Sequence, residues 1–286
     1  MISNFIISRL NIKFLKENLH RIPFFLFRVI FFKPCCNFYF FCLLYFKKYL
    51  FVRPKIENFN NQHSGDTIFI LGNGPSLSQV NFDALIHEVT MASNKIFICF
   101  DSTEWRPTYY SVEDDLVFKQ NLKKIKSVNS KKLFPDITIL FSGIIKDVTY
   151  FNYKQKHHYP REPNFGNSLY TGIYWGSSIV YTQIQLAVAM GAKKIILLGV
   201  DFNFDVPKEF KKTTKIIVSS GEINHFHPDY RKPGELWNQP NLQNQILAFN
   251  KAKSFCDENR VEILNATKGT HLEVFKKIDM PWLYHK

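Results

Sequence analysis

The chain has 286 residues, of which 45% are hydrophobic, and a formal net charge of +13. This length allows one large α/β domain, or one domain with an appendage, and the composition suffices for a core. Ten Lys or Arg against one acidic residue lie in residues 1–55, so the other 231 residues carry about +4. The basic excess therefore belongs to the N-terminal segment, and a nucleic-acid interpretation has to be tested on that segment. Residues 1–55 lack any recognisable nucleic-acid motif, and we expect no nucleic-acid partner.

The N-terminal segment, residues 1–57, is aromatic and basic and contains 12 of the 29 Phe. Its longest uncharged run, Pro34–Phe46, has 13 residues, fewer than the roughly 20 of a spanning helix. Rings and cations together suit a lipid headgroup boundary, which favours binding to a membrane surface through residues 1–55. The alternatives are a helical pair packed on the body, a docking surface for a partner, and a transmembrane span.

The five cysteines indicate a reducing compartment. Their number is odd, and no pair has zinc-ligand spacing with suitable partners. We therefore expect a cytoplasmic protein in which Cys35, Cys36, Cys42, Cys99 and Cys256 fill apolar space.

A polar hinge, Glu57–Asp66, precedes a region in which strands and helices alternate. Strands are predicted over residues 67–72, 89–94, 107–114, 136–143, 192–202 and 261–267. Helices are predicted over 116–130, 176–191 and 241–260, with a turn and a helix over 76–88. Strands that are apolar on both faces and separated by helices predict a mostly parallel sheet with helices on both faces. We assign residues 58–286 to this α/β domain.

Two long segments, residues 146–169 and 203–241, break the alternation. Compact domains rarely contain connections of this length unless they cover a site. We therefore expect residues 203–241 to form a lid.

The first predicted strand runs directly into Gly-Asn-Gly-Pro-Ser, residues 72–76. Ligands bind at the carboxyl ends of the strands in an open parallel sheet. Glycine there lets the backbone approach a phosphate or a ribose, and the next helix offers free N–H groups to an anion. The sequence is neither a P-loop nor GxGxxG. It predicts a nucleotide site, and a plain tight turn is the alternative.

Other polar residues follow the remaining strands. Asn94 would read a base or sugar edge, or simply turn the chain. Glu113 and Asp114 would bind a sugar hydroxyl or a metal, or begin a solvated helix. Asp201 would contact ligand or cap the longest strand. Thr267, Lys268 and Gly269 repeat the design of a polar turn after a strand and are expected beside the first glycine turn.

The segment "NHFHPDYRK", residues 224–232, places several chemically active groups within the predicted lid. A histidine, either His225 or His227, is the natural base for a hydroxyl at neutral pH. Tyr230 and Arg231 would meet a phosphate leaving group. The alternatives are a metal site built from the histidines and a carboxylate, and a solvated loop.

"IFILGNGPSL", an Asn after the next strand, "AMGAKKIILLGVDF" and a histidine loop together resemble a known family. The order and spacing are similar to those of the bacterial CMP-sialic-acid-dependent sialyltransferases of glycosyltransferase family 42. They also resemble the broader MptE-like family, whose namesakes are 6-hydroxymethylpterin diphosphokinases. The resemblance covers about residues 67–275.

The resemblance implies a Rossmann-like, variant GT-A fold and an inverting, metal-independent sugar transfer from a CMP donor, without a cofactor. The nucleotide would contact residues of the glycine turn and of the second strand end: Gly72, Asn73, Gly74, Pro75, Ser76 and Asn94. The family's Ser-Gly pair falls near Ser177 and Ser178, and its histidine base falls within residues 224–229. Asn203 stands where the family has a tyrosine at the donor phosphate, so Tyr230 or a nearby cation would have to replace it.

The resemblance further implies a surface-glycan acceptor, such as lipooligosaccharide or polysaccharide, and a homo-oligomer. Such acceptors are assembled at the cytoplasmic face of the inner membrane, so we expect a peripheral location there. One alternative is an MptE-like pyrophosphokinase that uses ATP and Mg²⁺, with Glu113, Asp114 and Asp201 as metal ligands. The other is a non-catalytic, membrane-associated nucleotide-binding protein.

Overall fold

The computed structural model describes residues 56, 59–155, 159–204 and 216–284. The chain divides into two units, Met1–Arg53 and Pro54–Lys286, and the description below concerns the second. The predicted membrane-binding segment therefore lies outside the described residues. Among the helices that are described, none is long and apolar enough to cross a membrane.

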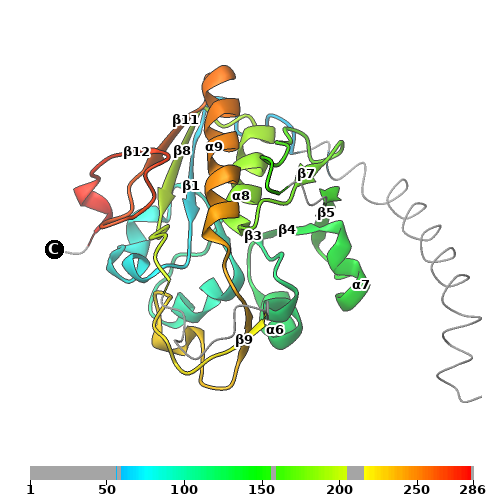
Figure 1. Cartoon of the computed structure of the whole chain (residues 1–286), viewed down its shortest axis with the longest axis vertical. Coiled ribbons are helices and arrows are strands. Elements are labelled where there is room, and N and C mark those ends of the chain that lie inside the picture. Colours follow the sequence, from blue (N-terminus) through cyan, green and yellow to red (C-terminus); the bar gives the residue numbers. More distant parts are fainter. Residues whose placement is uncertain (1–55, 57–58, 156–158, 205–215, 285–286) are drawn as a thin grey trace, which may run out of the picture. The chain divides into compact units, whose positions relative to one another are not determined.

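The domain is built on an eight-stranded sheet in the order β12-β11-β8-β1-β2-β3-β4-β5 (Figure 1). Every adjacent pair in this sheet is parallel. The predicted α/β, mostly parallel, Rossmann-like class is confirmed. The strands are β1 Thr67–Leu71, β2 Val89–Ser93, β3 Tyr109–Ser111, β4 Lys131–Pro135, β5 Val148–Phe151, β8 Lys194–Leu198, β11 Glu262–Asn265 and β12 Lys276–Lys277.

The two central strands show why the sequence forms this sheet. β1 and β8 are buried along their length after the first residue, and they pair in register from Thr67 with Lys194 to Leu71 with Leu198. Such continuous apolar runs suit a strand that is covered on both faces. The core therefore lies around β1 and β8.

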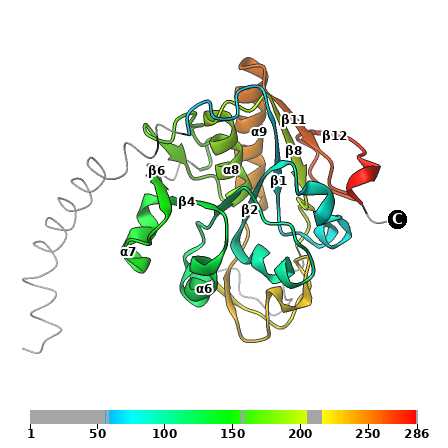
Figure 2. The same cartoon turned by 180° about the vertical axis from the view of Figure 1, so that it is seen from behind.

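The helices begin at polar caps that the sequence supplies. Asp114 Oδ1 accepts hydrogen bonds from the amides of Leu116 and Val117, and Ser178 caps α8. α8 and α9 lie side by side over one face of the sheet, and from behind β1 and β2 lie in front of them (Figure 2). The α-helices are α6 Asp115–Ser127, α7 Ile139–Ser142, α8 Ile179–Ala189 and α9 Leu242–Glu258. The 3-10 helices are η4 Pro75–Gln79, η5 Phe82–Leu85, η6 Asn94–Asp101, η7 Asp136–Thr138, η8 Pro228–Tyr230 and η9 Pro281–Leu283.

One predicted strand is wrong. Residues 136–143 form η7 and α7, and the strand β4 precedes them. Thr138 Oγ1 donates to the carbonyl of Pro135, and Asp136 Oδ1 accepts from the amide of Tyr153. One bond within the turn and one to the following strand region thus end the strand and override the β-propensity of the residues that follow.

The two segments expected to be irregular contain short strands. The first, residues 146–169, includes β5 at the edge of the main sheet and β6 (Tyr153–Lys154), which pairs with β7 (Ile173–Tyr174). The second, 203–241, includes an antiparallel pair of β9 (Ile216–Val218) with β10 (Leu236–Asn238). Residues 205–215 of that segment lie outside the description.

The turns after β1 and β8 pack directly against each other. The chain leaves β1 toward β2 and returns to β8 on the other side, so the sheet switches direction between these strands. A Cβ on Gly72 would lie 2.3 Å from the Gly199 carbonyl oxygen, and one on Gly74 would lie 2.0 Å from Asp201 Oδ2. Gly199 has φ +65°, a left-handed conformation that glycine adopts freely. The glycines are therefore required by contact between the two turns.

We predict that Gly74→Ala lowers the free energy of unfolding by about 1–3 kcal/mol, the usual cost of overpacking. The cost should shrink in an Asp201→Ala background, because the added methyl then loses its nearest neighbour. Urea unfolding of the wild type, both single variants and the double variant measures this coupling. If the costs of Gly74→Ala and Asp201→Ala simply add in the double variant, the result would contradict a contact between the added methyl group and Asp201.

Candidate functional site

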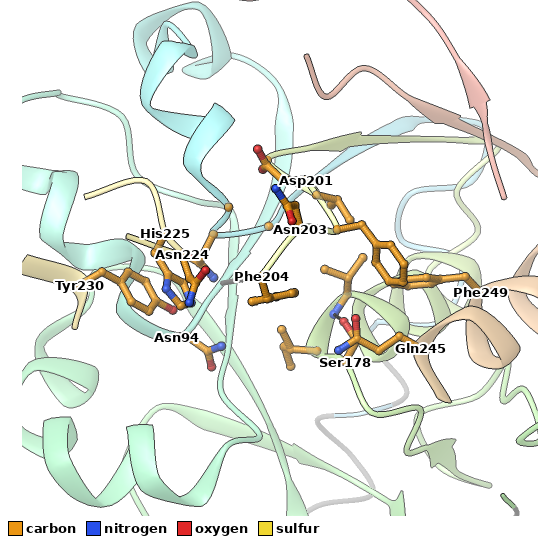
Figure 3. A pocket seen from close by; sticks show the side chains of 18 residues that line it. Asn94, Ser178, Asp201, Asn203, Phe204, Asn224, His225, Tyr230, Gln245 and Phe249 are labelled. Carbon is orange, nitrogen blue, oxygen red and sulfur yellow. Dashed lines mark hydrogen bonds between the residues drawn. The ribbon is translucent and has the colours of Figure 1, made fainter. Parts of the chain in front are cut away.

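A cavity lies at the carboxyl ends of β8, β1 and β2, at the switch point of the sheet. Its empty volume is about 640 Å³, including space open to solvent. Asn94, Asn224, His225 and Tyr230 lie on one side, Ser178, Gln245 and Phe249 on the other, with Phe204 between them (Figure 3). The remaining lining residues are Gly72, Asn73, Gly74, Ile179, Val180, Gly199, Val200, Asp201, Phe202 and Asn203.

Asn73 lines this cavity and carries a buried acceptor without a partner. Its Nδ2 donates to the Ser93 carbonyl at 3.3 Å and to Ser93 Oγ at 3.2 Å, which fixes the orientation of the amide. Its Oδ1 is buried and has no hydrogen-bond partner among the described residues. A buried acceptor without a partner is costly, so a ligand that donates a hydrogen bond here would gain from it.

Asn94 also lines the cavity, at the point where β2 ends. Its backbone has φ +53°, which asparagine tolerates better than most residues. Tyr110 Oη donates to its carbonyl at 2.5 Å and so holds this turn from the neighbouring strand β3.

His225 contributes an imidazole to the cavity wall. Its ring stacks on Tyr230, with ring centroids 3.9 Å apart and 6° between the planes. The amide of Phe226 donates to the Asn73 carbonyl at 3.1 Å and ties this loop to the first glycine turn. Burial, and then the charges of Arg231 and Lys95, hold the pKa of His225 well below its usual value, so the imidazole is neutral at pH 7.

His227 lies outside the cavity lining. Its Nδ1 accepts from the amide of Asp229 at 3.1 Å and caps η8. Arg231 is also outside the lining: its guanidinium stacks over Trp237 at 3.8 Å and lies 3.8 Å from Glu222. Of the four residues predicted to be catalytic, the structure brings His225 and Tyr230 to the cavity.

Asp201 and Ser76 bind each other. The amide and the hydroxyl of Ser76 donate to Asp201 Oδ1 and Oδ2, at 2.9 and 2.8 Å. Burial raises the pKa of Asp201, and the bonds from Ser76 oppose this. Although Asp201 reaches the cavity, both of its oxygens join the two glycine turns. Pro75 begins η4 next to this pair and, like Ser76, does not line the cavity.

Glu113 and Asp114 end β3 outside the cavity lining. Glu113 Oε2 accepts from Thr182 Oγ1 at 2.7 Å and from Tyr153 Oη at 3.0 Å. Burial raises the pKa of Glu113 to about 7. Asp114 caps α6 and accepts from Asn238 at 3.3 Å.

The residues predicted around the helix α8 and the last polar turn have mostly structural partners. Ser178 lines the cavity and caps α8, whereas Ser177 has φ +61° and its carbonyl accepts from Gln245. Thr267 Oγ1 accepts from the amide of Val200 at 3.0 Å. Lys268 lies 4.1 Å over the Tyr284 ring, and Gly269 has φ +65°.

Sequence reasoning missed several lining residues: Phe202, Phe204, Asn224, Gln245 and Phe249, besides the aliphatic Ile179 and Val180. Gln245 did carry a signal, since it is a polar residue on a buried face of α9. The three phenylalanines carried no such signal, because the sequence contains 29 Phe and nothing in it distinguishes these three.

The described lining is poor in charge. It contains no Lys or Arg, and its one carboxylate is Asp201. Within the part of the chain that the structure describes, no group of three or more His, Cys, Asp or Glu side chains could hold a metal ion.

Comparison with known proteins gives one family. A family model described as "6-hydroxymethylpterin diphosphokinase MptE-like" matches residues 45–207. No curated protein matches the chain by sequence.

Several solved structures are similar. The MAf glycosyltransferase of Magnetospirillum magneticum is 13% identical with a TM-score of 0.45; the match covers 80% of this chain and 38% of that one. The sialyltransferase CstII of Campylobacter jejuni, in complex with cytidine-5′-monophosphate, is 15% identical with a TM-score of 0.42, over 78% and 88% of the two chains. The α-2,3-sialyltransferase Cst-I of the same organism is 16% identical with a TM-score of 0.43, over 78% and 83%. With TM-scores below 0.5, these likenesses carry no argument about function.

We predict that Glu113 makes the folded state less stable as the pH rises. Its folded pKa of about 7 lies above the ordinary 4.5, so the folded state binds the proton more tightly. The contribution is most favourable below pH 4.5 and is lost as the pH rises to 7. The melting temperature of the wild type, relative to that of Glu113→Gln, should therefore fall between pH 5 and 7.5. A pH-independent difference between the two proteins would contradict the raised pKa.

Proposed function

The chain belongs to the MptE-like family, and from this premise and the geometry of its cavity we propose that it is a nucleotide-dependent transferase. In the reaction that we favour, a sugar, such as a sialic-acid-like sugar, moves from a CMP-activated donor to a hydroxyl of a surface glycan. The observation that carries the proposal is the neutral imidazole of His225 on the wall of a cavity at the sheet's switch point.

The donor's nucleoside fits the described chemistry of the cavity. The unused Oδ1 of Asn73 suits an amino or hydroxyl donor on the ligand. Phe204, which is partly exposed, offers an aromatic face to a flat ring, and the buried Phe249 lies in the same lining. In open parallel sheets, nucleotides bind at this same switch point. We therefore place the nucleoside between the first glycine turn and the aromatic side of the cavity.

His225 would act as the general base. The imidazole accepts the proton of the acceptor hydroxyl, whose oxygen forms a bond to the anomeric carbon. The bond from the anomeric carbon to the donor phosphate breaks, and its electron pair leaves with CMP. The attack comes from the face opposite to the leaving group, so the configuration inverts. A base must be unprotonated to serve, and the neutral state of His225 at pH 7 meets this requirement.

The state of the carboxylates supports sugar transfer over phosphoryl transfer. Enzymes that transfer phosphoryl groups hold Mg²⁺ with carboxylates and substrate phosphates. Both oxygens of Asp201 accept from Ser76, Glu113 Oε2 is bound by two hydroxyls, and Asp114 caps α6. The residues that a Mg²⁺ ion would need are thus bonded elsewhere, whereas sugar transfer with a nucleotide leaving group needs none of them.

The family description favours a second candidate, an ATP- and Mg²⁺-dependent diphosphokinase. The same imidazole would then accept the proton of a hydroxymethyl group, whose oxygen forms a bond to the β-phosphorus of ATP. The bond from that phosphorus to the bridging oxygen of the α-phosphate breaks, and AMP leaves with its electron pair. The two candidates differ in the nucleotide they bind and in their need for Mg²⁺.

The acceptor and the location rest on sequence features outside the described residues. The basic, aromatic residues 1–55 suit a membrane surface. We propose a glycolipid or polysaccharide acceptor, reached from the cytoplasmic face of the inner membrane, and a homo-oligomer.

We predict that CMP raises the melting temperature and that EDTA does not change the shift, since a ligand of the folded state stabilises it. Thermal denaturation with CMP, CDP, UDP, GDP and ATP, each with Mg²⁺ or with EDTA, measures this. A shift with ATP that requires Mg²⁺ would transfer the proposal to the diphosphokinase. A response to none of the five would contradict both candidates.

We predict that His225→Gln lowers the turnover number by about 10²–10⁴, the usual contribution of a general base. His227→Gln is the matched control and should retain turnover, because His227 lies outside the lining. The depressed pKa of His225 also places the acidic limb of the wild-type pH–rate profile below about 6.5. An equal loss in both variants, or an acidic limb above 6.5, would argue against His225 as the base.

A further inference from the structure

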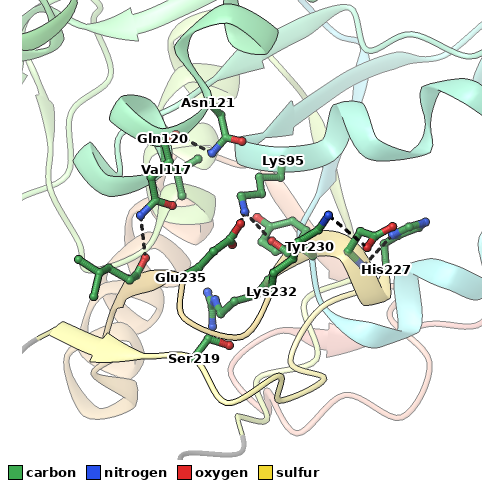
Figure 4. Close-up of polar contacts among 12 residues, drawn as sticks. Lys95, Val117, Gln120, Asn121, Ser219, His227, Tyr230, Lys232 and Glu235 are labelled. Carbon is green, nitrogen blue, oxygen red and sulfur yellow. Dashed lines mark hydrogen bonds and ion pairs between the residues drawn. The ribbon is translucent and has the colours of Figure 1, made fainter.

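Lys95 is a buried cation directly behind the wall of the cavity. It follows Asn94 in η6, and its side chain is 7% exposed. Its Nζ donates to the Tyr230 carbonyl and to Glu235 Oε2, each at 2.7 Å (Figure 4). Burial of a lysine is costly unless the charge is paired. Its two bonds lead to residues 135 and 140 positions further along the chain.

Lys95 and its two partners come from separate parts of the chain. Glu235 precedes β10, and its carbonyl accepts from the amide of Ser219, next to β9. Tyr230 ends η8, and its ring lies 5.8 Å from Lys95 Nζ. Lys95 itself stands at the end of β2. The lysine therefore joins the body of the sheet to both the β9–β10 pair and the histidine loop.

Tyr230 transmits this attachment to His225. The tyrosine is 3% exposed, and its ring lies flat against the imidazole at 3.9 Å. On the other side of His225, the amide of Phe226 is bound to Asn73. The imidazole is thus held between a bond to the first glycine turn and a ring fixed through Lys95.

We propose that Lys95, held by its bonds to the Tyr230 carbonyl and to Glu235, acts through its buried charge on the His225 imidazole that stacks on Tyr230. The proposal rests on the proposed role of His225 as the base. Lys95 does not line the cavity, so it would act by its charge and without touching a ligand.

The charge has a definite direction of effect. A nearby cation disfavours protonation of an imidazole, and Lys95 lowers the pKa of His225 after burial and Arg231. Glu235 forms an ion pair with Lys95, and Glu222 lies near Arg231, so each cation has an acidic partner that partly offsets its charge. The charged and titratable groups around the stacked rings of His225 and Tyr230 are Tyr230 itself, Lys95, Arg231, Glu222, Glu235 and Asp114.

Two variants that break the same ion pair test the proposal. Lys95→Met removes the cation and keeps the aliphatic stem, whereas Glu235→Gln keeps the cation and removes its counter-charge. If the two residues served only to pack the loop, both variants would loosen it and both would move the pKa of His225 up toward the ordinary value. If Lys95 acts by its charge, only Lys95→Met raises the pKa of His225. The rise stops short of the ordinary value, because burial and the charge of Arg231 still lower the pKa.

The measurement is the NMR titration of the His225 ring proton in the full chain, assigned as the signal missing in His225→Gln. We expect a higher midpoint in Lys95→Met and a midpoint that is unchanged or lower in Glu235→Gln. Lys253→Met is the matched control, because Lys253 forms a 2.7 Å ion pair with Asp257 on the surface of α9. Its midpoint should equal that of the wild type.

An unchanged midpoint in Lys95→Met, or a higher one in Glu235→Gln, would overturn the proposal. If Lys95→Met does not fold, the Glu235→Gln variant still decides. A higher His225 midpoint in that variant contradicts action by charge, and an unchanged or lower midpoint supports it. The titration needs no turnover, so a chain without transferase activity would refute the proposed function and leave this result standing. Where turnover is present, the acidic limb of the pH–rate profile should move up in Lys95→Met.

Discussion

The contact between the turns after β1 and β8 is the constraint on which the cavity depends. The two turns approach so closely that a Cβ on Gly72 or on Gly74 would collide with the backbone or the carboxylate of the other turn. Ser76 and Asp201 then fasten them with two hydrogen bonds. Because these turns lie at the switch point, their contact fixes where Asn73 and the end of β8 meet. The walls of the cavity follow from that junction.

The histidine loop depends on the same junction, although it lies far away in the sequence. Its backbone bonds to Asn73, and its tyrosine carbonyl bonds to Lys95 at the end of the next strand. Both anchors are therefore residues of strand ends, and the rigid sheet sets the distance between them. A loop held in this way presents His225 at one position and needs no regular structure of its own.

Much of the fold was readable from the sequence, and the failures have local causes. The strands at residues 67–71 and 194–198 and the helix α9 were predicted because their apolar patterns are long and uninterrupted. The segment 136–143 misled because its β-propensity is overridden by two hydrogen bonds that only the folded chain reveals. Thr138 donates to the Pro135 carbonyl, and Asp136 accepts from the Tyr153 amide. In the site, the sequence located the glycine turn, which lines the cavity, and the structure adds that its glycines pack against the turn after β8. The sequence could not decide between His225 and His227, because only the folded chain shows that His227 caps η8 and lies outside the cavity lining. Lys95 gave no signal, since its partners lie about 140 residues further along the chain.

The placement of charge explains how one imidazole can stay neutral beside a site meant for an anionic ligand. A phosphate group in the cavity would raise the pKa of a nearby histidine and so lower the fraction of the imidazole that is unprotonated at pH 7. The charges of Lys95 and Arg231 oppose this rise in the pKa of His225, and neither residue lines the cavity. Their own acidic partners, Glu235 and Glu222, limit the cost of burying them. In this arrangement the cations act on the base and leave the cavity wall to amides and aromatic rings, which select a ligand by shape and hydrogen bonds.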